Sequence, residues 1–177
     1  TLPKMNSQVF KNIVRFVFLV FLQVFIIDKV QLNVYFNPYI YILFILLLPV
    51  DIPRWLLLVL AFITGLSIDF FSGILGIHSA ATVFIAFIRP GIIKLIGEKE
   101  DAEQNLEPNI RNFGLLWFFT YVSFMAFLHH LVLFYIEVFR FNEFLDTLLR
   151  VVASSAVTIA LIIIIQLLFI RRIGPVR

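Results

Sequence analysis

Asp69 needs a chemical explanation, because it is a carboxylate within a long apolar stretch. It lies in GLSIDFFSGILGIHSAA, residues 65–81, four residues after Gly65 and nine before His78. A carboxylate in hydrocarbon is costly, so it either ties the chain together through hydrogen bonds or couples the movement of a proton or substrate. As a structural group, Asp69 would accept hydrogen bonds from Ser72 or the amides of the following turn, or pair with His78. The sequence leaves both roles open.

Three histidines are the other candidate ligands or acid–base groups. His129 and His130 are adjacent, with Glu137 one or two helical turns later, and His78 lies further upstream. Imidazoles and carboxylates together can bind zinc, but adjacent helical residues point about 100° apart and no spacing here matches a zinc motif. We therefore expect no metal and no cofactor. One of the adjacent histidines is expected to face lipid headgroups or a neighbouring helix.

Arg89-Pro90 is a second polar feature within an apolar stretch. Proline removes a backbone donor, so Pro90 should interrupt and kink its helix. A long arginine side chain can reach the nearest aqueous interface, and we expect Arg89 to do so, with an anion site as the alternative. Gln23, in the first apolar stretch, is expected to form an interhelical hydrogen bond.

Other catalytic patterns are missing from the sequence. It contains no cysteine, which excludes disulfides, thiolate nucleophiles and cysteine-based zinc sites. It has no glycine-rich phosphate loop, no nucleophile elbow and no HExxH motif. These features predict a protein that is not an enzyme.

Composition indicates the environment in which these residues act. Of the 177 residues, 62% are hydrophobic and 14% charged, and the mean hydropathy is +1.03; soluble domains have roughly 25% charged residues. The apolar residues recur in long runs over most of the chain, so residues 1–177 are expected to form a single integral membrane domain. The net charge of +3 comes from basic residues flanking these runs, so no nucleic-acid partner is expected. The first methionine is Met5, where we expect translation to start.

The apolar runs predict an all-α, polytopic membrane protein with six transmembrane helices, since about 20 residues cross the hydrocarbon core. The second helix is short: Asn37-Pro38 suits a helix start, and Pro49 weakens its last turn. A solvated, acidic cytoplasmic loop is expected at about 97–112. The helices are expected at about 10–27, 37–50, 55–71, 77–96, 113–136 and 151–170.

The basic residues predict the orientation, because they concentrate on the cytoplasmic side of membrane proteins. With both termini cytoplasmic, only three of the 14 Lys and Arg residues fall outside: Lys29, Arg140 and Arg150. In this orientation Asp69 lies about 21 Å along the third helix, near the outer interface.

Together these features resemble the rod shape-determining MreD family, in the form found in Bacteroidetes. The resemblance covers most of the chain from Met5. It is strongest in NPYIYILFILLLPVDIPRWLLLVLAFITGLSIDFFSGILGIHSAA, residues 37–81, and in FIRP, residues 87–90. The residues that carry it are a glycine, an aspartate four residues later, and a glycine before a small-residue helix: Gly65, Asp69, Gly76, Ala80 and Ala81.

The resemblance implies a bacterial inner-membrane scaffold of the cell-elongation (rod) complex, which supports cell shape and peptidoglycan synthesis. MreC is its expected direct partner. MreB, RodA and the class B penicillin-binding transpeptidase are expected to associate through the complex, with membrane lipids around it. The candidate structural or partner-contact residues are Gly65, Asp69, Gly76, His78, Arg89 and Pro90.

The family's fold resembles the six-helix substrate-binding component of energy-coupling-factor (ECF) vitamin transporters, which supplies an alternative function. The first helix, RFVFLVFLQVFII, lacks the Ala-xxx-Ala face with which those subunits dock their coupling protein. The outer loops also offer few polar groups beyond Asp69, His78 and the adjacent histidines. The scaffold is therefore the preferred hypothesis.

Overall fold

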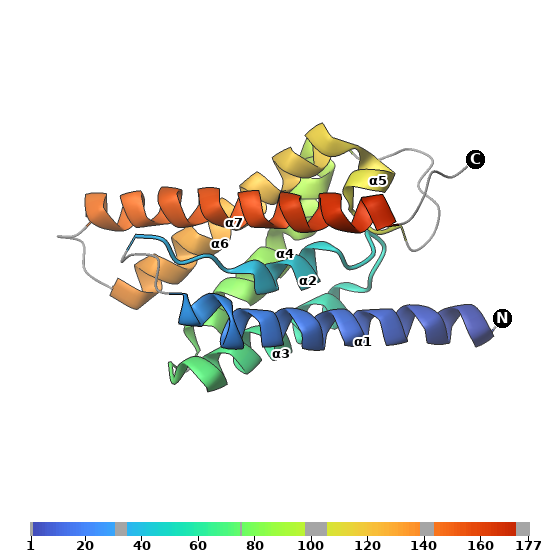
Figure 1. Ribbon diagram of the computed structural model, residues 1–177, viewed down its shortest axis with the longest axis horizontal. Helices are drawn as coiled ribbons and strands as arrows, with labels where there is room; N and C mark the ends of the chain where they lie inside the picture. The colour runs from blue at the N-terminus through green and yellow to red at the C-terminus, as the bar shows by residue number, and fades with distance from the viewer. Residues whose placement is uncertain (1, 31–34, 75, 98–105, 139–143, 173–177) are drawn as a thin grey trace.

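The computed structural model describes residues 2–30, 35–74, 76–97, 106–138 and 144–172, and their regular secondary structure is helical (Figure 1). The chain thus has the expected all-α class. Its elements are α1 (Leu2–Phe25), η1 (Ile27–Lys29), η2 (Ile40–Ile42), α2 (Leu43–Leu46), α3 (Arg54–Ser72), α4 (Ile77–Ile96), α5 (Ile110–Phe113), α6 (Leu115–Val138) and α7 (Phe144–Arg172).

Five helices in the described part of the chain are long and apolar enough to cross a membrane: α1, α3, α4, α6 and α7. They correspond to the predicted helices at 10–27, 55–71, 77–96, 113–136 and 151–170. The largest differences are at two helix starts: α1 begins at Leu2 rather than near residue 10, and α7 begins at Phe144 rather than near residue 151. This architecture is that of a multi-pass helical membrane protein.

The sixth predicted span, at 37–50, is wrong in extent. Only η2, a 3-10 helix, and α2, a single α-helical turn, are helical in this stretch. Together they rise about 12 Å, well short of the roughly 30 Å hydrocarbon core. Pro38 and Pro49 flank them, and each proline lacks an N–H and disfavours helical geometry in the residue before it.

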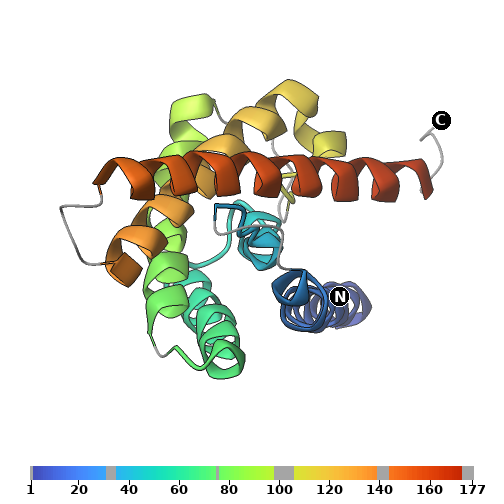
Figure 2. The same ribbon diagram turned by 60° about the vertical axis from the view of Figure 1, so that its left-hand side comes forward.

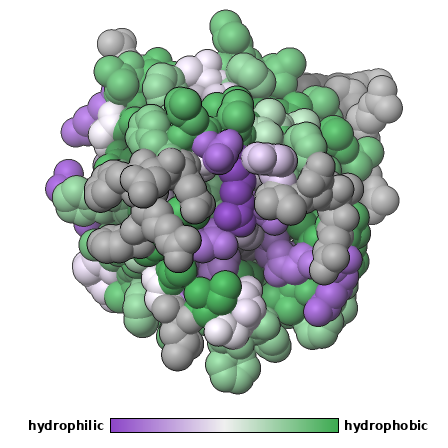
Figure 3. All heavy atoms as spheres, turned by 90° about the vertical axis from the view of Figure 1, so that its left-hand side faces the viewer, coloured by the Kyte–Doolittle hydropathy of each residue, from purple (hydrophilic) through white to green (hydrophobic). Residues whose placement is uncertain are grey.

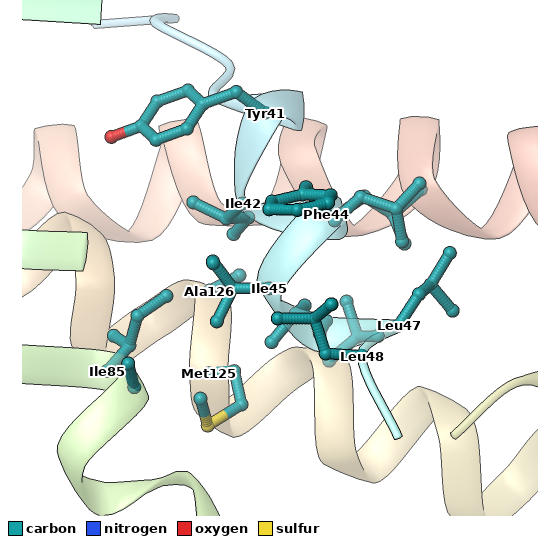
Figure 4. Close-up of a cluster of buried hydrophobic side chains, with 14 of the residues drawn as sticks. Tyr41, Ile42, Phe44, Ile45, Leu47, Leu48, Ile85, Met125 and Ala126 are labelled. Carbon is teal, nitrogen blue, oxygen red and sulfur yellow. The ribbon is translucent and has the colours of Figure 1, made fainter. Parts of the chain in front are cut away.

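The short helix α2 lies in the core instead of facing lipid. Every residue from 40 to 48 is at most 4% exposed, as expected for a helix that is apolar all round. Figures 1 and 2 both show α2 between α1 and α7. Ile85 of α4 and Met125 and Ala126 of α6 lie beside it in Figure 4.

The buried segment also provides the return pass of the chain. The start of α1 and the end of α7 lie at the same end of the molecule, on the right of Figure 1. Five long antiparallel passes alone would leave them at opposite ends. Residues 35–50 run back through the interior, and the Val50 N–H then donates to the Leu106 carbonyl at 3.0 Å.

Candidate functional site

Asp69 joins α3 to the first turn of α4. Its buried carboxylate accepts hydrogen bonds from the N–H groups of His78 (2.9 Å) and Ser79 (3.0 Å), the Ser79 hydroxyl (2.5 Å) and His78 Nδ1 (3.0 Å). First-turn amides lack intrahelical acceptors, and the helix dipole favours an anion there. Asp69 therefore caps α4, whose N-cap residue Gly76 (φ +95°) has no side chain to do so. The serine partner is Ser79, where the sequence suggested Ser72.

Gly65 lies one turn before Asp69, where the backbones of α3 and α4 touch. A Cβ at this position would lie 2.6 Å from the Ser79 nitrogen and 2.7 Å from the His78 carbonyl oxygen. These separations are too short for any side chain, so only glycine allows this approach. The Gly65–Asp69 spacing thus places the close contact and the cap on the same face of α3.

Arg89 is fully buried, so the prediction that it reaches the membrane surface is wrong. Its guanidinium donates to the carbonyls of Leu48 and Pro49, the latter at 3.3 Å, and to the Tyr121 hydroxyl at 2.8 Å. Tyr121 in turn donates to the Leu46 carbonyl at 3.2 Å. The Leu48 and Pro49 carbonyls follow the C-cap of α2 and so lie outside its hydrogen-bond ladder, which leaves them in need of other donors when buried. Arg89 finds these acceptors because α2 ends inside the bundle.

Pro90 does not interrupt the fourth helix as predicted, because α4 runs from Ile77 to Ile96 through this residue. The proline ring fixes φ near −65°, which is a helical value, so only the backbone hydrogen bond is lost. Arg89 therefore projects into the core from a continuous helix.

Gln23 of α1 binds backbone groups just before and at the start of η2. Its buried side chain donates to the Pro38 carbonyl at 3.0 Å and accepts from the Ile40 N–H at 2.8 Å. It also donates to Asp28 Oδ1 at 2.7 Å. The predicted hydrogen-bonding role is thus directed at backbone, which is tolerated at membrane depth only where the protein satisfies it.

Two hydroxyls of α7 bind the same segment. Ser154 accepts from the Asn37 N–H at 3.0 Å and donates to the Tyr35 carbonyl at 2.9 Å. Thr158, one turn later, accepts from the Tyr39 N–H at 3.0 Å. α7 therefore presents this polar edge to an irregular segment of backbone.

The three histidines surround Tyr39. Their ring centroids lie 5.3 Å (His78), 6.0 Å (His129) and 5.3 Å (His130) from that of Tyr39. His129 and His130 are both fully buried, so neither faces lipid headgroups. His130 Nε2 lies 3.2 Å from the Thr158 hydroxyl on α7, which corresponds to the neighbouring-helix alternative. Within the described residues, no group of His, Asp and Glu side chains is arranged to hold a metal ion.

A cavity of about 680 Å³ opens where α1 and α3 end. Figure 3 views this end and shows hydrophilic residues (purple) near the middle of a largely apolar surface. The volume is typical of small-ligand sites. Asp69 orients the His78 imidazole that lines the cavity. The lining residues relevant here are polar (Asp28, Lys29, Asn37, Tyr39, Ser72 and His78) and apolar (Val24, Ile27, Val30, Phe36, Phe71 and Ile74).

Glu107 was missed by sequence reasoning, which placed it in a solvated loop at 97–112. Residues 98–105 of that loop, with most of its charges, lie outside the described residues. Glu107 itself is only 7% exposed, and its carboxylate lies 2.9 Å from both Lys11 Nζ and an Arg15 nitrogen. Nothing in the local sequence pairs it with a helix more than 90 residues earlier.

The arrangement favours binding and positioning over covalent chemistry. The Ser79 hydroxyl donates to Asp69, so it is not aligned with the His78 imidazole as a nucleophile with its base would be. The Asp69–His78 pair instead holds one imidazole in the cavity wall.

Comparisons with protein-family models, with curated proteins and with solved structures give no match. The function is therefore inferred from the sequence resemblance and from the geometry above.

Proposed function

We propose that this chain is a non-catalytic scaffold of the bacterial cell-elongation complex, held in the inner membrane with both termini cytoplasmic. It would bind MreC directly and, through the complex, MreB, RodA and the class B penicillin-binding transpeptidase. The proposal starts from the resemblance of residues 37–90 to the MreD family. The structural observation that best supports this proposal is the exposed apolar face of α1.

α1 is the least buried of the five long helices. Only 17% of its apolar span is buried, against 33–44% in the other four. Phe10, Ile13, Val14 and Val17 are 50–69% exposed, and their spacing places them on one helical face; we call this the α1 face. Helices in lipid associate through close van der Waals packing, so this face suits the single membrane helix of MreC.

The polar interior supports a structural role. Asp69 caps α4, Arg89 binds the carbonyls that follow α2, and Gln23 binds the backbone before it. These groups are engaged with the chain's own backbone. They stabilise a fixed shape on which a partner can assemble.

Photo-crosslinking tests the α1 face. A photoreactive residue replacing Phe10, Val14 or Val17 should crosslink to MreC in living cells. Matched controls at Phe62 of α3 and Phe87 of α4, which are at least half exposed, should not. Equal crosslinking at all five positions would contradict the assignment of this face, and failure of MreC to co-purify would contradict the scaffold function.

The cavity supports a second candidate, the substrate-binding subunit of an ECF-type vitamin transporter. Its 680 Å³ volume and its polar groups would suit a small soluble molecule. Co-purification with a coupling protein and paired ATPases, in place of MreC, would select this function.

A further inference from the structure

Two opposite charges lie side by side on the cavity wall. Asp28 and Lys29 are consecutive in η1, and both are exposed and line the cavity. Gln23, itself buried, donates to Asp28 Oδ1 at 2.7 Å and so fixes the carboxylate. His78, only 5% exposed, adds an imidazole oriented by Asp69. The wall therefore offers a fixed carboxylate, a fixed imidazole and a flexible ammonium group.

Four phenylalanine rings continue from the cavity along the surface of α1 and α3. The ring centroids are 4.7 Å apart for Phe21–Phe25, 6.1 Å for Phe25–Phe71 and 5.5 Å for Phe70–Phe71. All four side chains are more than half exposed, and Phe71 also lines the cavity. This phenylalanine row connects a polar cavity to an apolar surface, and on α1 it continues the α1 face toward the end of the helix, since Phe21 lies one turn after Val17.

The cavity lies at the level where lipid headgroups meet hydrocarbon. Lys29 ends the first candidate span and Ser72 ends the second. The 19 residues of α3 rise about 28 Å, close to the thickness of the hydrocarbon core. A ligand here would contact charged groups at one end and apolar side chains at the other.

We propose that this cavity binds the headgroup of a phospholipid that carries a primary ammonium and a phosphate, with its acyl chains along the phenylalanine row. The ammonium donates to the Asp28 carboxylate and the His78 imidazole, and the phosphate lies beside Lys29, because charge-assisted hydrogen bonds are the strong ones. The inference does not depend on the scaffold function, since it requires only that α1 and α3 span the bilayer.

The first test uses the unmodified protein. Purified protein in mild detergent is equilibrated with equal amounts of phosphatidylethanolamine, phosphatidylcholine and phosphatidylglycerol, and native mass spectrometry measures which lipid is retained. A trimethylated amine keeps its charge but has no N–H donor. Phosphatidylethanolamine should therefore be retained about tenfold more than either other lipid. Equal retention of the three lipids would overturn the proposal.

Two variants test the location of the site. Asp28→Asn keeps an oxygen acceptor for Gln23 and should abolish the preference for phosphatidylethanolamine over phosphatidylcholine. Lys29→Gln should lower the retention of both phosphatidylethanolamine and phosphatidylcholine, because each carries a phosphate. The matched controls are Asp51→Asn and Lys94→Gln, which make the same changes at exposed positions near the opposite ends of α3 and α4. If the cavity variants retain lipid as these controls do, the proposed site is wrong.

Free phosphoethanolamine tests whether the ligand is a lipid or a soluble zwitterion. Phosphatidylethanolamine should raise the midpoint of thermal unfolding, whereas the free headgroup should not, because it makes no contact with the phenylalanine row. Equal stabilisation by the free headgroup would assign the cavity to a soluble molecule and overturn the lipid proposal.

Discussion

Asp69 and Arg89 are two fully buried charges that satisfy backbone groups, one at the start of α4 and the other just after α2. Asp69 accepts from the first-turn amides of α4, and Arg89 donates to carbonyls just after α2. The negative charge of Asp69 also matches the helix dipole at the N-terminus of α4, whereas Arg89 meets individual backbone carbonyls that lie beyond the single turn of α2. A buried charge without such partners costs several kcal/mol, which explains why both residues are held by several hydrogen bonds.

The Asp69 cap predicts that Asp69→Asn will lower the free energy of unfolding by about 3 kcal/mol. The amide turns a nitrogen donor toward the donors of His78 and Ser79, leaving buried groups unpaired. Unfolding in mixed micelles with rising dodecyl sulfate content measures the loss. Asp146→Asn, at an exposed position in the first turn of α7, should change stability by less than about 1 kcal/mol. Equal losses in both variants would contradict the capping role.

The Gly65 contact predicts different results for two glycine substitutions. Gly65→Ala should cost about 2 kcal/mol, because the new methyl group meets the backbone of α4 and overpacking of this kind costs 1–3 kcal/mol. Gly91→Ala has open space around its Cβ and should leave stability unchanged or raise it by up to about 1 kcal/mol. The same unfolding titration compares the two, and a larger loss for Gly91→Ala would show that α3 and α4 do not touch at Gly65.

Residues 35–50, the least regular of the described segments, connect four of the long helices through hydrogen bonds. Residues 35–50 receive hydrogen bonds from α1, α4, α6 and α7 through Gln23, Arg89, Tyr121 and Ser154. These side chains satisfy backbone groups that a complete helix would have satisfied internally. α2 can therefore be short and still lie within a membrane protein.

The sequence predicts the long helices well, because a run of about 20 apolar residues matches the thickness of the hydrocarbon core. It also identifies Gly65, Asp69, Gly76 and Arg89 as unusual. The sequence does not predict that α2 ends after one turn, because the apolar run at 40–48 has the composition of a transmembrane helix. Only the packing of other helices around this run shows that it is buried in the protein. The hydrogen bonds of Arg89 with the segment after α2 and the ion pairs of Glu107 with α1 are not predicted for the same reason. Both are contacts between segments that are distant in the sequence.

The binding of α2 by Arg89 predicts graded effects of two substitutions. Arg89→Met should cost about 3 kcal/mol, because the buried Leu48 carbonyl and Tyr121 hydroxyl lose a donor. The Pro49 carbonyl then keeps only a long hydrogen bond from the Ile52 N–H, at 3.4 Å. Arg89→Lys keeps the charge but loses the planar fork of donors, so its loss should be smaller. Hydrogen exchange of the amides at 43–48 should accelerate more in Arg89→Met than in Arg89→Lys. Arg54→Met, at an exposed position, should leave exchange unchanged, and a similar acceleration there would contradict the assigned role.

At the scale of the whole molecule, the two ends are built differently. One end carries the cavity between the ends of α1 and α3. At the other, Glu107 binds Lys11 and Arg15 and ties the segment before α5 to the middle of α1. The ion pairs hold α1, the least buried long helix, to the rest of the protein while its α1 face stays exposed.

The Glu107 ion pairs predict a specific covalent crosslink. A carbodiimide should join Lys11 to Glu107, whose charged atoms lie 2.9 Å apart, and peptide mass spectrometry should detect the amide. Glu107→Gln should abolish it without affecting crosslinks elsewhere. A crosslink from Lys11 only to other carboxylates would show that the segment before α5 lies elsewhere.

Cysteine labelling is the most direct test of the central claim, that residues 35–50 form a complete pass of the chain through the bundle. The protein has no cysteine, so Lys29→Cys and Asp51→Cys each introduce one thiol, at exposed positions on either side of this segment. In the proposed inner-membrane orientation, with both termini cytoplasmic, a membrane-impermeant maleimide applied to spheroplasts should label Lys29→Cys at once and Asp51→Cys only after the membrane is permeabilised. Labelling of both from the same side would contradict the pass and leave five crossings, with the two termini on opposite sides of the membrane.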